Sequence, residues 1–398
     1  MGRGKRILSG LLAAGLLFWG TAAVWAEPED DQTNQAELNL SAPSAVLMEV
    51  STGQILYEKS ADEERSPASI TKIMTLLLIF EELEKGNLHL EDMVTTSAYA
   101  KSMGGSQVFL EEGEQQTVET MIKCIVVASG NDASVAMAEH IAGSEEEFVK
   151  RMNQRAQELG MSHSHFEDCC GLTDSATHYT TAGDVAVASR ELVSRFPQVL
   201  DYSSIWMENI THTTAQGTKE FTLANTNKLV RSYEGCVGLK TGSTSVAKYC
   251  VSAVAERDGL QLIAVVMGAP EPKGRFADAS AMLNYGFGVC KFYEDENQDQ
   301  LEKVKVTHST KSRIACEYAG PFRYLDTKGQ SLQEVEKEIQ LPEQVEAPVK
   351  KGDVVGRVIY SLGGTELGSV EILASEDAAE AGFWDCLKRA IGELLISS

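Results

Sequence analysis

The sequence is poor in basic residues. Lysine and arginine total 35 against 58 aspartate and glutamate residues, and the formal net charge is -23 at pH 7. Such a chain repels nucleic acid and anionic bilayers, so nucleic acid is not expected as a partner. Hydrophobic residues make up 43% of the 398 residues, which is enough to bury a core in two or three domains.

Long apolar runs are absent outside the N-terminus. There, the basic stretch Arg3–Arg6 precedes an apolar run over Ile7–Val24, and Val24-Trp25-Ala26 places small residues where a signal peptidase reads them. Because the run is short for a membrane span, residues 1–26 are predicted as a cleaved signal peptide, with an uncleaved anchor as the alternative. The polar residues 27–37 are interpreted as a linker.

A disulfide framework is also absent. The eight cysteines are irregularly spaced, and several lie in apolar runs, as Cys124 does in Met121–Val127. Buried free thiols are therefore favoured over disulfides, even in an exported chain. Cys169-Cys170 lacks the spacing of metal ligands, and the nearby His178 is interpreted as an ordinary polar residue, so no metal site is predicted.

The order of predicted elements indicates one sheet covered by helices. Strands are expected over Ala45–Val50 and Gln54–Glu58 and, late in the chain, over Val237–Thr241, Tyr249–Ala255 and Leu260–Met267. Helical spacing predicts helices at Ser69–Lys85, Thr117–Val127, Asp132–Ala142, Glu145–Leu159 and Thr181–Val193. This order favours an α+β fold over residues 38–292, with a mostly antiparallel five-stranded sheet covered by helices.

The C-terminal part of the chain has a different pattern. The polar stretch Tyr293–Glu302 is the predicted domain boundary, and short strands punctuated by glycine and proline predict a small all-β domain over residues 303–375. In residues 381–398, apolar side chains such as Trp384 and Ile391 fall on one helical face. We expect an amphipathic helix that anchors the protein at a membrane surface; packing on its own β domain is the alternative.

Three short motifs carry the candidate chemistry. In Ser69-Ile70-Thr71-Lys72 the serine and lysine face the same way on a helix, and a desolvated lysine can take the proton of a serine nucleophile. Ser129-Gly130-Asn131 offers a hydroxyl and an amide on a turn between helices. Lys240-Thr241-Gly242 ends a strand, where the glycine admits a ligand and the other two can bind a carboxylate. Each motif alone is a weak signal and is more often an ordinary cap, helix connection or turn.

Together, and in this order, the motifs resemble those of penicillin-binding proteins and class A β-lactamases. Pro67–Thr75, Ser129–Ala133 and Gly238–Gly242 are most similar to the low-molecular-weight D-alanyl-D-alanine carboxypeptidases, and the similarity runs from about residue 38 to residue 292. Val349–Asp353 resembles the β-rich domain that follows in that family. Val237, where many relatives have aspartate, departs from the pattern but removes no catalytic side chain.

The resemblance implies a serine peptidase that removes the terminal D-alanine from peptidoglycan stem peptides ending in D-Ala-D-Ala and that binds β-lactam antibiotics covalently. By this resemblance Ser69 attacks, Lys72 is the general base and Ser129 passes a proton to the leaving amine. Substrate binding is assigned to Asn131, Lys240, Thr241, Gly242, Ser243 and Arg275. Ser243 replaces a common histidine, but its N–H can still pair with that of Ser69 in an oxyanion hole. The implied location is the outer face of the cytoplasmic membrane, and the chemistry requires no cofactor or metal.

Two other functions remain as alternatives. A class A β-lactamase needs a glutamate and an asparagine that position the deacylating water, and Phe166–Gly171 contains Glu167 without that asparagine. A non-catalytic wall-binding protein would have no use for Ser69, Lys72 and Lys240, so their presence argues against it.

Overall fold

The structure is a computed structural model that describes residues 38–385. The predicted signal peptide (1–26), the linker (27–37) and most of the predicted C-terminal helix (381–398) lie outside these residues. Within residues 38–385, no helix combines the length and the apolar character that a membrane crossing requires.

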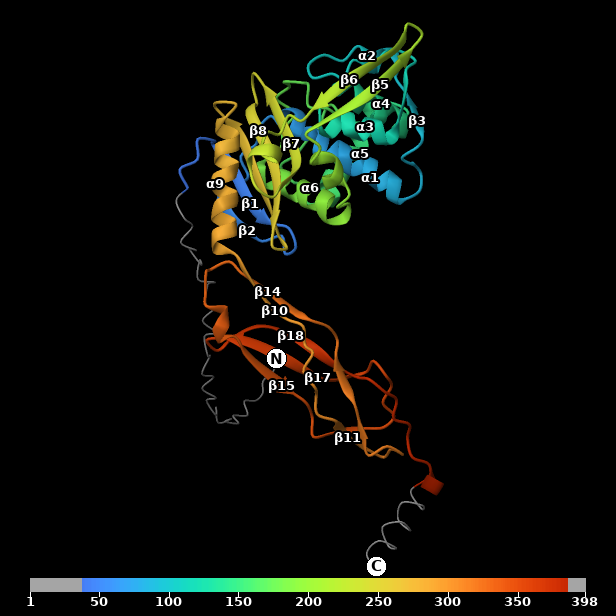
Figure 1. The fold of residues 1–398 in the computed structure, drawn as a ribbon, viewed down its shortest axis with the longest axis vertical. Coiled ribbons are helices and arrows are strands. Elements are labelled where there is room, and N and C mark those ends of the chain that lie inside the picture. The colour runs from blue at the N-terminus through green and yellow to red at the C-terminus, as the bar shows by residue number, and fades with distance from the viewer. Residues whose placement is uncertain (1–37, 386–398) are drawn as a thin grey trace, which may run out of the picture. The chain divides into compact units, whose positions relative to one another are not determined.

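A five-stranded antiparallel sheet organises the first part of the described chain (Figure 1). Its strands, in spatial order, are β2 (Ile55–Lys59), β1 (Ser44–Glu49), β9 (Leu260–Ala269), β8 (Lys248–Arg257) and β7 (Cys236–Thr244). The five predicted strands and the α+β class are confirmed. Because β7 lies at the edge of the sheet, its outer side is open to contact with the helical region.

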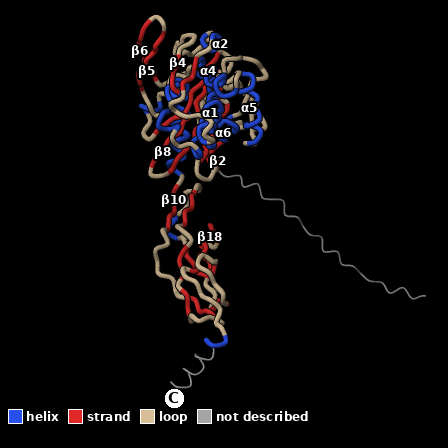
Figure 2. Tube along the Cα trace, turned by 90° about the vertical axis from the view of Figure 1, so that its right-hand side faces the viewer, coloured by secondary structure: helices blue, strands red, loops and turns tan. Residues whose placement is uncertain are grey.

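Helices cover both faces of this sheet (Figures 1 and 2). On β1, Val46 and Met48 belong to the core shared with helix α6 (Ala182–Arg195), whereas Ala45 and Leu47 belong to the core beneath helix α9 (Gly274–Val289). This alternation is the period-two pattern of a strand buried on both faces. Hydrophobic burial on the two sides therefore fixes the register of the sheet.

Helix α9 was not predicted from the sequence. It contains Gly286 and Gly288, residues that disfavour helix interiors. A Cβ atom at Gly286 would lie 2.6 Å from Cδ1 of Leu262 on β9, so the glycine allows the helix to approach the sheet closely. Tertiary packing here outweighs the local propensity.

The helical region surrounds helix α1 (Lys72–Glu84), in which every residue from Lys72 to Glu81 is buried. Around it lie α2 (Ala98–Lys101), α3 (Val118–Val126), α4 (Asn131–Ala142) and α5 (Glu145–Glu158). Thr117, Ser144 and Thr181 each cap a helix by accepting a backbone N–H with the side-chain hydroxyl. The predicted helices are confirmed with small shifts at their ends.

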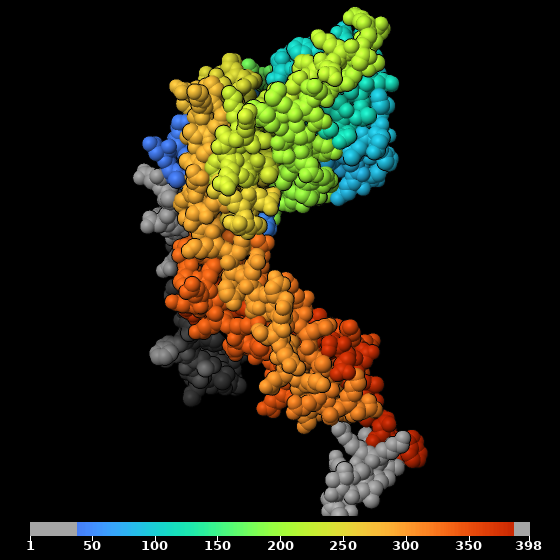
Figure 3. Space-filling model, in the orientation of Figure 1, coloured from blue at the N-terminus to red at the C-terminus, as the bar shows by residue number. Residues whose placement is uncertain are grey.

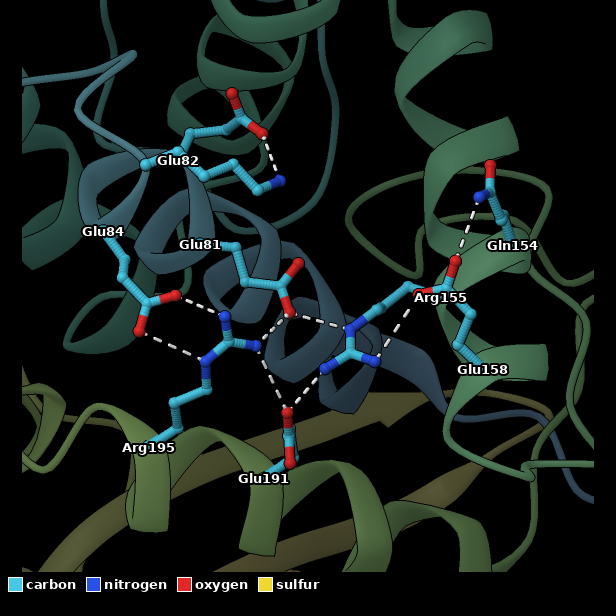
Figure 4. Close-up of polar contacts among 9 residues, drawn as sticks. Glu81, Glu82, Glu84, Gln154, Arg155, Glu158, Glu191 and Arg195 are labelled. Atoms are coloured by element: carbon cyan, nitrogen blue, oxygen red, sulfur yellow. Dashed lines mark hydrogen bonds and ion pairs between the residues drawn. The ribbon is translucent and has the colours of Figure 1, made fainter.

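A cluster of charged side chains joins three of these helices (Figure 4). Glu81 of α1, with 7% of its side chain exposed, accepts hydrogen bonds from Arg155 Nε of α5 at 2.7 Å and from Arg195 of α6 at 3.1 Å. Glu191 also contacts both arginines. Each of these four charged side chains therefore has a partner of opposite charge, which offsets most of the desolvation free energy of its burial.

Two small β pairs and, besides α2, two further short helices were not predicted. They are β3 (Met93–Thr95) with β4 (Gln115–Thr117), the hairpin β5 (Met207–Thr214) with β6 (Gly217–Ala224), α7 (Val199–Ser203) and α8 (Leu229–Ser232). Most residues of the hairpin are exposed or half-buried. A hairpin with so little burial lacks the apolar alternation that identifies strands in a sequence.

Between Lys291 and Ala374 the described chain is all-β apart from one short 3₁₀ turn, η2 (Leu332–Glu334). Its strands are β10 (Lys291–Asp295), β11 (Val304–Thr307), β12 (Arg313–Ile314), β13 (Cys316–Tyr318), β14 (Phe322–Asp326), β15 (Glu336–Gln340), β16 (Gln344–Glu346), β17 (Val354–Leu362) and β18 (Thr365–Ala374). Phe322 and the buried Tyr360 stack at 3.8 Å in its core. The stretch proposed as a polar boundary begins inside a strand, because β10 pairs with β14.

The cysteines within the described residues are free thiols, and all of them except Cys316 are buried. The prediction of buried thiols rather than disulfides is therefore confirmed for this part of the chain. Cys386 lies outside the described residues.

Candidate active site

The first motif forms a tight turn followed by a buried helix. Ser69 lies in the 3₁₀ helix η1 (Ala68–Thr71), and Lys72 begins α1. Side chains three residues apart eclipse each other in a 3₁₀ turn. Lys72 Nζ accordingly lies 3.1 Å from Ser69 Oγ. The serine is half-buried and accessible, whereas the lysine is fully buried.

Lys72 has three hydrogen-bond acceptors around its amine. Besides Ser69 Oγ, Nζ contacts Asn131 Oδ1 at 2.6 Å and the backbone oxygen of Cys170 at 2.7 Å. Burial lowers the pKa of Lys72 below its ordinary value. Once deprotonated, the amine keeps two protons for Asn131 and Cys170, and its lone pair remains for the hydroxyl of Ser69. The geometry therefore suits proton transfer from serine to lysine.

The second and third motifs meet through another buried lysine. Lys240 Nζ donates to Ser129 Oγ at 2.9 Å and to the backbone oxygen of Thr241 at 2.9 Å. Burial lowers the pKa of Lys240, and the neighbouring charge of Lys72 adds to the effect. Ser129 has a φ of 62°, a left-handed conformation that is uncommon for serine. Two lysines and two serines thus share one small region.

Strand β7 passes very close to the turn that holds Ser69. A Cβ atom at Gly242 would lie 2.8 Å from the backbone oxygen of Pro67 and 2.9 Å from the backbone nitrogen of Ser69. Only glycine fits there without displacement of one of the two segments. Ser243 follows with an exposed side chain, and Thr241 Oγ1 donates to Thr226 Oγ1 at 2.7 Å.

Arg275 contacts the same strand from helix α9. Its guanidinium donates to the backbone oxygen of Gly242 at 3.0 Å and to that of Cys250 at 3.2 Å. Burial lowers its pKa. Arg275 therefore supports the strand that carries the third motif, and all nine candidate residues belong to a single contact network or directly adjoin it.

Asn131 is oriented by a loop that was not predicted to take part. The side-chain Nδ2 of Asn131 donates to the backbone oxygen of Gly104 at 2.8 Å, and the backbone N–H of Asn131 donates to the backbone oxygen of Ser106 at 2.8 Å. With Nδ2 occupied in this way, Oδ1 faces Lys72. The loop thus sets which amide atom meets the lysine.

The segment around Asp168 supplies the third partner of Lys72. The Asp168 carboxylate accepts the backbone N–H groups of Cys170 and Thr173, each at 2.8 Å. This bonding shapes the turn that presents the oxygen of Cys170. Glu145, Asp168 and Cys170 lie close enough together to hold a cation, but both carboxylates already accept backbone N–H groups, Glu145 that of Cys169. We therefore assign these three residues a structural role in shaping the turn.

His178 also contacts the first motif. Its Nδ1 accepts the N–H of Glu167 at 3.0 Å, so the proton lies on Nε2, which donates to Thr71 Oγ1 at 2.9 Å. Burial lowers the pKa of His178, in keeping with a neutral ring. The sequence interpretation of His178 as an ordinary polar residue did not anticipate this contact, because it joins segments 107 positions apart.

Comparisons with known proteins identify the family of this chain. Residues 30–271 match the family model for D-alanyl-D-alanine carboxypeptidase, and residues 291–380 match that for the C-terminal domain of penicillin-binding protein 5. The chain is 42% identical to D-alanyl-D-alanine carboxypeptidase DacF of Bacillus subtilis over 390 residues, which cover 98% of each chain.

Solved structures resemble it as well. Penicillin-binding protein 5 from Haemophilus influenzae matches with a TM-score of 0.68 and 30% identity, over 86% of this chain and 99% of that one. Penicillin-binding protein D2 from Listeria monocytogenes, solved in its ampicillin-bound form, matches with a TM-score of 0.53 and 32% identity, over 63% of this chain and 99% of that one. The chain belongs to the D-alanyl-D-alanine carboxypeptidase family and is a serine hydrolase.

Proposed function

We propose that the protein removes the terminal D-alanine from peptidoglycan stem peptides through an acyl-enzyme on Ser69, and that β-lactams acylate the same serine. The observation that carries the proposal is the contact of Ser69 Oγ with Lys72 Nζ at 3.1 Å, in a site where Lys72 is fully buried. A serine hydroxyl needs such a base, because it is a weak nucleophile by itself.

The acylation step begins with neutral Lys72. Ser69 Oγ attacks the carbonyl between the two D-alanines as its proton moves to Lys72 Nζ, and an ester forms while the amide C–N bond breaks. Backbone N–H groups of Ser69 and Ser243 stabilise the oxyanion. Ser129, hydrogen-bonded to Lys240, delivers its proton to the departing amine of D-alanine and receives in exchange the proton that Lys72 took from Ser69, so that Lys72 is neutral again. Lys240 and Thr241 hold the carboxylate of D-alanine.

Water then hydrolyses the ester and regenerates Ser69, with Lys72 as base a second time. A bulky penicilloyl group hinders this water, so penicillin is expected to inhibit slowly and nearly stoichiometrically. Glu167, the carboxylate that a β-lactamase would need, is exposed and accepts a hydrogen bond from Thr177. The carboxypeptidase is therefore favoured over the β-lactamase. Ampicillin binding by the Listeria relative supports the β-lactam part of the proposal.

The test combines a covalent label with product release. Fluorescent penicillin should label the wild-type protein, and a peptide ending in D-Ala-D-Ala should release D-alanine with many turnovers. Ser69→Ala should lose both activities and retain the folded circular-dichroism spectrum, whereas Ser245→Ala, at a nearby exposed serine, should keep both. Label on Ser69→Ala, or rapid penicillin hydrolysis without D-alanine release, would reject the proposal.

The protein is proposed to act outside the cytoplasmic membrane, held at its surface by the amphipathic segment 381–398. At the start of this segment, Phe383 and Trp384 are 75% and 71% exposed, as expected for side chains that enter a lipid interface. Deletion of the chain from Ala381 onward should release a signal-cleaved protein from membranes. If the shortened protein still sediments with membranes, the anchor lies elsewhere.

A further inference from the structure

The loop beside the second motif, residues 104–110, is fixed by hydrogen bonds at several points. Asp132, which follows Asn131 and is 1% exposed, accepts the backbone N–H groups of Val108 and Leu110, each at 3.1 Å. Gly104 and Ser106 of the same loop bind Asn131, as described above. The loop therefore has a fixed path that starts at the candidate catalytic site.

Phe109, between the two residues whose backbone N–H groups bind Asp132, is both strained and exposed. Its φ is 62°, and the residue is 63% exposed, whereas Val108 and Leu110 on either side are buried. A left-handed conformation costs a bulky residue roughly 1–3 kcal/mol, and an exposed ring recovers little of that by burial. Burial in the core therefore does not account for a phenylalanine at this position.

A second aromatic ring faces Phe109 from the β5–β6 hairpin. The Phe221 ring lies 5.8 Å from that of Phe109 in an edge-to-face arrangement. Polar contacts fasten the hairpin to β4 and the turn before it: His212 Nδ1 donates to Glu114 at 2.7 Å, and the Gln116 amide donates to the backbone oxygen of Thr211 at 2.8 Å. In Figure 3 the hairpin surface, in light green, adjoins the turquoise surface of the helical region. Buried hydrogen bonds to Asp132 thus fix the loop that carries Phe109, and those to Glu114 and from Gln116 fix the hairpin that carries Phe221.

The rings form part of a pocket of about 460 Å³, a volume suited to a small-molecule unit. The lining includes Phe109, Phe221, Glu111, Gln216, Thr218 and Lys219. Glu111 is paired with Lys101, so the pocket presents both donors and acceptors without one dominant charge. A flat C–H face against the rings and hydroxyl or acetamido groups toward the polar side chains would match this lining.

We propose that this pocket binds an N-acetylhexosamine unit of the glycan to which the stem peptide is attached. The inference rests on the proposed function, because it assumes a peptidoglycan substrate. Phe109 is five residues beyond Gly104, a span of at most about 18 Å. The four stem residues before the scissile bond extend over about 14 Å, and the sugar linkage adds to this reach. The proposal requires the stem residues and the sugar linkage together to bridge Ser69 and the pocket.

The first experiment compares two substrates that differ only in the sugar. Release of D-alanine is measured from a free pentapeptide and from the same pentapeptide on its disaccharide. We expect wild-type kcat/KM to be higher for the disaccharide form, and Phe109→Ala or Phe221→Ala to lower the ratio of the two values roughly ten-fold. Phe109→Tyr should restore the ratio, and Met207→Ala, at a 57% exposed residue of the hairpin outside the pocket lining, should leave it unchanged. Equal losses on both substrates would overturn the proposal.

The second experiment does not depend on catalysis. Calorimetric titration of the full protein with N,N′-diacetylchitobiose should show binding to wild type and to Ser69→Ala, and weaker binding to Phe109→Ala. Absence of binding to wild type, or binding that Phe109→Ala leaves intact, would refute the glycan pocket. If neither substrate releases D-alanine, the proposed function fails, and the titration still decides on the pocket.

Discussion

Gly242→Ala tests how closely strand β7 must approach the nucleophile. The added methyl group would lie 2.8 Å from the backbone oxygen of Pro67 and 2.9 Å from the backbone nitrogens of Ser69 and Ile70. Ordinary carbon contacts with such atoms need about 3.4 Å or more, so strand and turn must separate by roughly half an ångström. All three atoms are backbone, and no side chain can rotate away to relieve the contact.

The expected consequence is a large kinetic effect with a smaller effect on stability. Overpacking of this kind costs about 1–3 kcal/mol of unfolding free energy. A displacement of roughly half an ångström between the serine and the oxyanion donors should reduce the penicillin acylation rate by about ten-fold or more, since misplacement by about 1 Å costs around a hundred-fold. Stopped-flow acylation with fluorescent penicillin and urea denaturation measure the two effects.

Gly288→Ala is the matched control. A Cβ atom at Gly288 of α9 meets no atom within 4 Å, and alanine favours a helix interior, so this variant should be as active as wild type and up to about 1 kcal/mol more stable. If Gly242→Ala acylates at the wild-type rate, the close approach of β7 to Ser69 is not a requirement of the site, and the reasoning is refuted.

Three further outcomes concern charge. Because burial lowers the pKa of Lys72, the acylation rate should rise with pH and reach a plateau at a pH below the ordinary pKa of lysine. An acylation rate that does not change between about pH 5 and about pH 10 would exclude Lys72 as the base. Burial also lowers the pKa of His178, so the folded state binds fewer protons than the unfolded chain, and the unfolding free energy should fall as pH drops below about 6.5. His178→Gln should flatten that part of the profile in urea denaturation, and an unchanged slope would contradict a neutral His178. Glu81→Gln leaves two arginines without their buried partner and should cost about 2–3 kcal/mol in the same assay, against less than about 1 kcal/mol for the exposed Glu147→Gln; equal losses would show that burial is not the cause.

The sequence by itself determined the main order of elements and the residues of the three motifs. The five sheet strands and the helices around them carry regular apolar patterns, because each buries a defined face. The Ser69–Lys72 pair is readable because both residues belong to one helical turn. Elements whose formation depends on distant partners were missed: α9 packs through glycine, the β5–β6 hairpin buries little, and β10 is defined by its pairing with β14.

Only the tertiary structure decided what surrounds the motifs. Lys72 meets the backbone oxygen of Cys170, 98 positions away, and any residue type could have offered that atom. The contact of His178 with Thr71 and the approach of Gly242 to Ser69 likewise join segments far apart in the chain. Backbone atoms and long-range contacts leave no residue-type signature in a single sequence. The pKa values of the two lysines, which depend on these surroundings, therefore follow from the fold and not from the motifs.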